Sequence, residues 1–347
     1  MKFLFIIILS FSIANSFAQN NIPEQSLQQI KIIELQLKKD ADSMIYADSW
    51  FVRFKADSSF IKNFVQALKQ PYSFWYNFDS VQTISKLYAP DSSFKIFTWE
   101  VMKDYTYYRQ RGAIQFPTKD GSLKLIPLFD FSDFTKKPYD SIRNAQHWIG
   151  SIYYKIILKT YNNKNYYTLL GLDNNDARST KKWIEVLSFD NEGKPQFGGK
   201  FVYPSTDATK PPQGAARFCL EFKKDAGARM NYDARYDAII FDHLTSESDD
   251  IKSKHTLVPY GDYEGFKWIN GTWTFIKNPF AGTVFDDKQT DFPSLILDEN
   301  GNRKEKKLDD ASKKNQQKQQ QPVKQNDNPN RINDKKNQYK TGESSNS

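Results

Sequence analysis

After Pro71, an alternation of apolar and polar residues with a period of two runs through most of the chain and limits what it can fold into. Short runs rich in Val, Ile, Phe, Tyr and Trp are separated by clusters of Asn, Asp, Gly and Pro. This pattern is typical of β-strands joined by tight turns. Strands are predicted at residues 81–88, 94–101, 106–116, 123–129, 149–159, 166–172, 183–189, 196–203, 217–222, 229–232, 238–244, 263–269 and 272–276.

The connections between most of these strands are short. Short connections join antiparallel neighbours, because a parallel pair needs a crossover of roughly a dozen residues or more. A single open sheet of this size would leave one face and two edges in water. We therefore predict an antiparallel meander over residues 81–285 that closes as a barrel-like or two-layer sheet. The aromatic content of 15% suits such a β-rich core.

Two helices are predicted before the strands, within residues 19–80. Over residues 21–47, apolar side chains recur at helical spacing, and Pro23 suits a first turn. Over residues 58–70, Phe60 and Phe64 belong to one apolar stripe, which ends before Pro71. The predicted fold class is therefore mainly β with an N-terminal helical segment, an α+β protein.

The two ends of the chain differ in composition from the part between them. Residues 1–18 combine Lys2, a short apolar run and small residues at Ser16 and Ala18, which is the pattern of a signal peptide. The run is too short for a membrane-spanning helix. We predict an exported protein that is periplasmic, cell-surface or secreted and does not span a membrane. Residues 286–347, a low-complexity segment rich in Lys, Gln and Asn, are predicted to be a disordered tail.

The net charge of +8 is concentrated in that tail. Residues 303–347 hold twelve Lys and Arg against six Asp and Glu, so the tail can contact acidic surfaces. The rest of the chain is almost neutral and lacks the basic surplus that nucleic-acid binding needs, so no nucleic-acid partner is predicted. One cysteine and three scattered histidines offer neither a disulfide nor the ligand spacing of a zinc site.

Several segments of the β region carry a combined signature. They include Phe-Lys-Ile-Phe-Thr-Trp-Glu at 94–100, Tyr-Tyr-Thr-Leu-Leu-Gly-Leu-Asp at 166–173, Ile-Phe-Asp-His-Leu at 240–244 and Tyr-Glu-Gly-Phe-Lys-Trp at 263–268. Together these segments resemble a family of uncharacterised secreted β-rich proteins of Bacteroidota-type bacteria, over about residues 41–276. The resemblance implies export. It implies no activity, ligand or site residue, because that family has no established function.

Asp242 and His243 are the candidate acid–base residues. Neighbouring side chains on a strand point to opposite faces, so each of the two would need another partner. A structural or surface pair is the alternative interpretation. The sequence has no nucleophile motif such as Gly-x-Ser-x-Gly, no glycine-rich phosphate loop and no His-Glu-x-x-His.

The loop after the strand at 166–172 contains Asp173, Asn175 and Asp176. Their oxygen atoms are the kind of ligand that calcium prefers, and calcium is the one cofactor that the sequence suggests. The complete Asp-x-Asp-x-Asp-Gly pattern is absent, and the same residue types are common in turns that bind no metal.

The Asn-Gly pair at 270–271 predicts a hairpin with a two-residue loop. In that register Trp268 lies opposite Trp273 and Phe266 lies opposite Phe275, so the four aromatic side chains share one face. An exposed face of this kind would be a platform for sugar rings, with Trp268, Trp273 and Phe266 as binding residues. A buried face would instead be part of the core, which the polar opposite face of the hairpin favours.

These observations predict function only in outline. The missing catalytic motifs favour a non-catalytic binding protein, or an accessory or structural protein, of the cell envelope or the secreted fraction. A glycan or an envelope protein is the expected partner class. The alternative is a hydrolase that acts on an envelope or extracellular polymer with Asp242, His243 or scattered acids.

Overall fold

The computed structural model describes residues 22–204, 206–212, 215–248, 250–280 and 313. The chain divides into two units, Met1–Ala281 and Gly282–Ser347, and every element discussed below belongs to the first. The predicted signal peptide at 1–18 lies outside the described residues, and so does the predicted tail at 286–347 apart from Lys313. Among the described residues, no helix combines the length and the apolar character that crossing a membrane requires.

Two helices form the first layer. Helix α1 (Glu24–Tyr46) begins directly after Pro23, and α2 (Trp50–Leu68) packs against it. The start of α2 lies eight residues before the predicted start at residue 58. The first half of α2 was not predicted because its inward face carries the charged side chains Arg53 and Asp57, which are buried although they do not fit an apolar pattern. Arg53 donates hydrogen bonds to the carbonyl of Ala47 at 2.6 Å and to that of Met102 at 2.7 Å.

The strands form three sheets. The helix-side sheet has the order β1 (Ser85–Tyr88), β2 (Lys95–Asp104), β3 (Tyr107–Phe116), β4 (Lys124–Leu128). The middle sheet has the order β5 (Arg143–Asn144), β9 (Pro195–Phe197), β8 (Ser179–Phe189), β7 (Lys164–Asp173), β6 (Ile152–Tyr161), and β11 (Phe218–Lys223) also pairs with β8. The outer sheet has the order β10 (Phe201–Val202), β15 (Thr272–Ile276), β14 (Leu257–Ile269), β13 (Ala238–Ser246), β12 (Met230–Asp233). Short 3-10 helices occur at η1 (Ser73–Trp75), η2 (Ser132–Phe134), η3 (Ala145–His147) and η4 (Lys254–Thr256).

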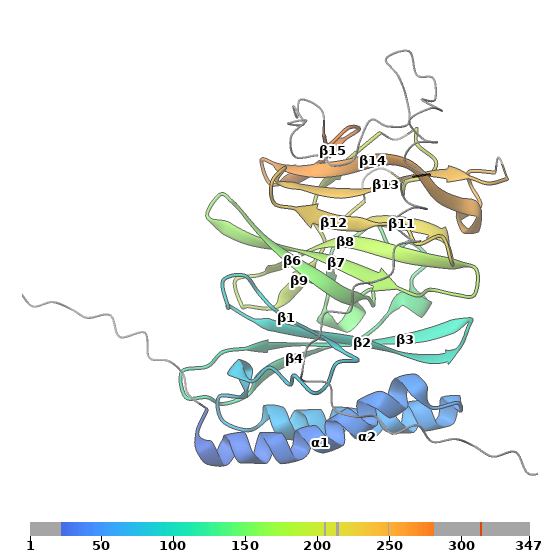
Figure 1. The fold of residues 1–347 in the computed structure, drawn as a ribbon. Helices are drawn as coiled ribbons and strands as arrows, with labels where there is room; N and C mark the ends of the chain where they lie inside the picture. Colours follow the sequence, from blue (N-terminus) through green and yellow to red (C-terminus); the bar gives the residue numbers. More distant parts are fainter. Residues whose placement is uncertain (1–21, 205, 213–214, 249, 281–312, 314–347) are drawn as a thin grey trace, which may run out of the picture. The chain divides into compact units, whose positions relative to one another are not determined.

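The helices and the three sheets stack as layers (Figure 1). One apolar cluster joins the helices to the helix-side sheet, a second joins that sheet to the middle sheet, and a third joins the middle and outer sheets. The pairs between described strands are antiparallel, except that β10 runs parallel to β15. The predicted fold class is confirmed, and the described sheets are layered and open.

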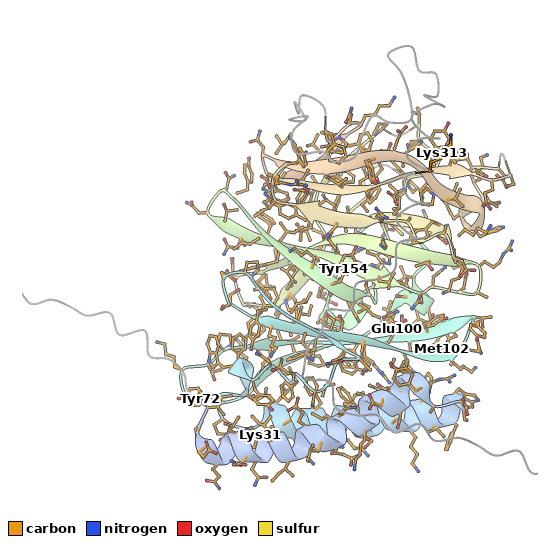
Figure 2. All side chains as sticks on the ribbon, in the orientation of Figure 1. Lys31, Tyr72, Glu100, Met102, Tyr154 and Lys313 are labelled. Atoms are coloured by element: carbon orange, nitrogen blue, oxygen red, sulfur yellow. The ribbon has the colours of Figure 1, made fainter. Side chains whose placement is uncertain are left out.

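Polar side chains also join neighbouring sheets. Glu100 of β2, labelled in Figure 2, accepts hydrogen bonds from Gln110 Nε2 at 2.9 Å and from Asn174, which follows β7. Burial raises the pKa of Glu100. Tyr154 of β6, also labelled there, donates its hydroxyl to the carbonyl of Met230 in β12 at 2.9 Å. These contacts fix how the middle sheet faces its two neighbours.

A buried polar chain crosses the centre of the middle sheet. Arg217 Nε donates to Glu185 Oε1 at 2.7 Å, and Tyr153 donates its hydroxyl to Glu185 Oε2 at 2.6 Å. The indole of Trp148 in turn donates to the Tyr153 hydroxyl at 2.7 Å. The side chains of Arg217 and Glu185 are only 0% and 2% exposed, so this ion pair is removed from water. It lies within the layered core, where Tyr153, Trp148 and Arg217 are fully buried.

Lys95 of β2 is buried among aromatic rings on the helix side, with 1% of its surface exposed. Its ammonium donates to the carbonyl of Tyr76 at 2.6 Å and lies 4.3 Å from the ring centroid of Tyr88. The pKa of Lys95 is lowered from 10.5 to about 7, mainly by burial and also by the nearby charge of Lys86, while Asp79 acts in the opposite direction. The ring faces partly compensate the loss of water around the ammonium.

The buried Lys95 predicts a pH dependence of stability. Between about pH 7 and pH 10.5 the unfolded chain holds a proton that folded Lys95 has released, so this residue makes folding more favourable as pH rises through that range. Relative to Lys95→Met, the free energy of unfolding of the unaltered protein should rise by up to about 1.4 kcal/mol per pH unit. Urea unfolding from about pH 7 to about pH 9.5 measures the difference. A constant difference across that range contradicts the prediction, and Lys103→Met, an exposed lysine on the same strand, is the control.

Candidate functional site

The candidate site lies where the pairing of β13 with β14 is interrupted. Asp242 pairs with Tyr263 and Leu244 pairs with Pro259, so a single β13 residue, His243, faces the three β14 residues at 260–262. Gly261 has φ 104°, a conformation that side-chain-bearing residues rarely adopt and that glycine permits. Such a bulge bends the strand and turns its side chains away from the sheet. Tyr260 is accordingly 66% exposed.

A charged cluster stands behind His243. The Nδ1 atom of His243 lies 3.2 Å from Glu264 Oε1. Glu264 Oε2 also contacts the ammonium of Lys210 at 2.9 Å, and Lys210 pairs in turn with Asp207. The side chain of Lys210 is 1% exposed, and its ammonium lies over the ring of Phe275 at 5.0 Å. Glu264 is therefore held from the protein side by Lys210, and it orients the imidazole toward solvent.

His243 and Glu264 border a pocket of about 410 Å³. We refer to it as the His243 pocket, and its lining residues are His243, Asp262, Tyr263, Glu264, Lys277, Asn278 and Phe280. The rings of Tyr263 and Phe280 meet edge to face, with centroids 5.7 Å apart. The pocket thus places aromatic rings beside carboxylate, amide and cationic groups.

Asp242, the second predicted acid–base residue, does not line this pocket. Its carboxylate accepts a hydrogen bond from the backbone N–H of Arg229 at 2.6 Å, and its own N–H donates to the Arg229 carbonyl at 3.1 Å. With 7% of its surface exposed, Asp242 fixes the chain just before β12. Asp242 and His243 therefore contact different partners, and only His243 is placed to meet a ligand.

The predicted hairpin register is confirmed, with Trp268 opposite Trp273 and Phe266 opposite Phe275. Its aromatic face is turned into the core. Phe266 and Trp273 are 0% exposed, and the indole of Trp273 donates to Thr168 Oγ1 at 2.9 Å. Trp268 is partly buried and packs against Tyr166, with ring centroids 5.4 Å apart. Phe266 and Trp273 are therefore core residues, as the polar opposite face of the hairpin favoured, and a sugar-stacking role for these two rings is wrong because both are fully buried.

The predicted calcium ligands form a closed turn. Asp173 Oδ1 accepts the N–H of Asn175 at 2.8 Å, and Asp176 accepts two backbone N–H groups further along the loop. The amide oxygen of Asn175 accepts from the ammonium of Lys181 at 2.6 Å. Burial raises the pKa of Asp173 to about 6. In the described part of the chain, no group of three or more His, Cys, Asp or Glu is placed to hold a metal ion, and this loop matches the turn interpretation.

Sequence reasoning found His243 but missed Glu264, Lys210 and Asp207. Glu264 lies twenty-one residues after His243 and meets it only through the pairing of β13 with β14. Lys210 lies in the connection between β10 and β11, which has no periodic pattern to place it. The one local signal was Gly261 inside an alternating segment, which indicates a bulge.

Comparison of this chain with family models, with curated proteins and with solved structures finds no match. The resemblance to a secreted bacterial family therefore stays a prediction, and so does export. Functional inference rests on the geometry of the site itself.

Proposed function

We propose that this protein is an exported, non-catalytic binding protein whose His243 pocket holds a saccharide unit of an envelope glycan. The observation that carries the proposal is Tyr263, which is 37% exposed and lines a concave site together with Asp262 and Asn278. An aromatic ring offers flat apolar area to the C–H face of a sugar. Carboxylate and amide groups next to it can accept and donate hydrogen bonds with the hydroxyl groups.

The charged cluster favours binding over hydrolysis. Both oxygens of Glu264 lie within 3.1 Å of the Lys210 ammonium, and one also contacts His243. This carboxylate is therefore occupied, whereas glycoside hydrolysis usually needs two carboxyl groups that both reach the substrate. His243 keeps Nε2 for a ligand hydroxyl because Glu264 engages Nδ1. Support for export comes from the pattern of residues 1–18 alone.

Binding is tested with the full chain and a panel of soluble bacterial cell-wall polysaccharides. A ligand of the folded state raises the melting temperature in a concentration-dependent way. We expect Tyr263→Ala to weaken binding roughly tenfold, equal to about 1.4 kcal/mol. His243→Gln should weaken it as well. Tyr105→Ala is the matched control, because Tyr105 is an exposed tyrosine in the turn between β2 and β3, away from the His243 pocket.

Three results would overturn the proposal. Binding that Tyr263→Ala and His243→Gln leave unchanged places the ligand elsewhere. Release of new reducing ends from the polysaccharide, lost in His243→Gln and kept in Tyr105→Ala, supports the hydrolase alternative. The absence of any melting shift across the panel argues against a glycan and favours a protein partner.

A further inference from the structure

A second pocket lies on the opposite side of the helix-side sheet from the middle sheet, between helix α2 and strands β3 and β4. Its volume is about 240 Å³. We refer to it as the α2 groove, and its lining residues are Ile61, Phe64, Val65, Leu68, Trp99, Arg109, Gln110, Arg111, Gly112, Ala113, Leu125, Pro127, Leu128, Phe129 and Asp130. It shares no residue with the His243 pocket.

The walls of the α2 groove are mainly apolar. One wall is the face of α2 that carries Ile61 and Val65, both only partly buried, and the other includes Leu125 of β4. Phe129, just after β4, is 50% exposed at the border of the groove. The apolar stripe predicted for this helix includes Phe60 and Phe64, and no role was predicted for Ile61 and Val65 beside it.

Most of the charges along the groove are already engaged. Arg111 makes a two-pronged contact with Asp57 Oδ2, at 3.0 Å from Nε and 2.7 Å from the terminal nitrogen. Asp57 is fully buried and also accepts from the indole of Trp99 at 2.9 Å. Asp130 accepts hydrogen bonds from the N–H groups of Ser132 and Gly150 at 3.0 and 3.2 Å. Arg111 and Asp57 therefore neutralise each other, and the Asp130 carboxylate is held by backbone N–H groups.

Arg109 is the exception. It is exposed, and among the residues that the structure describes it has no ion-pair partner. A guanidinium presents several N–H donors in one plane and matches a carboxylate or phosphate. An apolar cavity with one guanidinium at its border is suited to an apolar molecule that carries one anionic group.

We propose that the α2 groove binds a single-chain amphiphile with an anionic head group, such as a fatty acid. The chain lies between Val65 and Leu125, where it replaces water along apolar walls. The head group contacts Arg109. The small volume suits one unbranched chain and excludes a two-chain phospholipid from full burial. This inference does not depend on the proposed glycan site.

Dodecanoate, titrated into the full chain below its critical micelle concentration and followed by calorimetry, is the test. We expect saturable binding at one site, and we expect Arg109→Gln to weaken it roughly tenfold. Val65→Trp should abolish it, because the larger side chain fills the groove. Ile61→Trp is the second variant in case Val65→Trp does not fold. Arg235→Gln is the matched control, since Arg235 is an exposed arginine in the turn between β12 and β13.

Head-group dependence completes the test. Dodecanol and dodecyltrimethylammonium have the same chain without the negative charge, and both should bind at least tenfold more weakly than dodecanoate. Equal binding of all three, or dodecanoate binding that survives both Val65→Trp and Ile61→Trp in folded protein, overturns the proposal. Loss of dodecanoate binding in Tyr263→Ala would also overturn it, because that variant alters only the His243 pocket.

Discussion

Replacing Arg217 with methionine is expected to lower the free energy of unfolding by about 3 to 5 kcal/mol, because it leaves the Glu185 carboxylate buried without its cation. Glu185 would keep the hydrogen bond from Tyr153, which cannot neutralise a full charge. Arg217 also donates to the carbonyl of Phe197 at 3.1 Å, so the variant frees a buried acceptor in β9 as well. Urea unfolding at neutral pH, compared with the unaltered protein, measures the loss.

A double variant separates a buried ion pair from a general packing effect. Arg217→Met combined with Glu185→Leu removes both charges, and we expect it to recover most of the lost stability. If the double variant is as unstable as Arg217→Met alone, the uncompensated charge is not the cause. Arg235→Met provides the exposed comparison, because Arg235 pairs with Asp233 at the surface and its loss should lower stability far less than the loss of Arg217.

Trp273→Ala is expected to destabilise the protein by about 3 to 5 kcal/mol, because it removes a fully buried indole and leaves a cavity between the middle and outer sheets. The change also leaves Thr168 Oγ1 without the hydrogen bond from the indole. Thermal unfolding followed by circular dichroism measures the loss. Trp50→Ala is the control, since Trp50 is 50% exposed and its loss should have a much smaller effect.

The same variant distinguishes the two interpretations of the hairpin aromatics. If Trp273 is a core residue, Trp273→Ala lowers the melting temperature strongly. The affinity for a glycan is then unchanged at temperatures where the variant is still folded. A binding platform would give the opposite pattern, with lower affinity and little change in melting temperature. That pattern would contradict the burial described above.

Local signals in the sequence account for the parts of the fold that were predicted. The Asn-Gly pair at 270–271 sets the register of β14 and β15 by itself, because a two-residue loop of that type allows one pairing. The start of α2 was missed because Arg53 and Asp57 interrupt the apolar stripe while their partners come from β2 and β3. No local pattern shows a partner fifty residues away.

The division into three sheets could not be predicted for the same reason, because it depends on pairings between segments that are far apart in the sequence. One edge of β8 pairs with β11 at its first half and with β9 at its second half. The strands have similar alternating patterns, so the sequence predicts which segments are strands but not which strands pair with each other. The candidate site follows this rule, because His243 stood out as a residue type, whereas Glu264 and Lys210 join it only through tertiary structure.

The parallel pairing of β10 with β15 has a consequence for the order in which the chain can assemble. Residues 201–202 pair with residues 273–274, which belong to the last strand of the described fold. This edge of the outer sheet cannot form until that strand is present. Because the N-terminal part of a chain is synthesised first, the helices and the helix-side sheet can form well before the outer sheet can close. Pairing of two strands so far apart in the sequence is slow relative to hairpin formation. Any chaperone that accompanies the chain would meet an incomplete outer sheet until residue 276 has emerged.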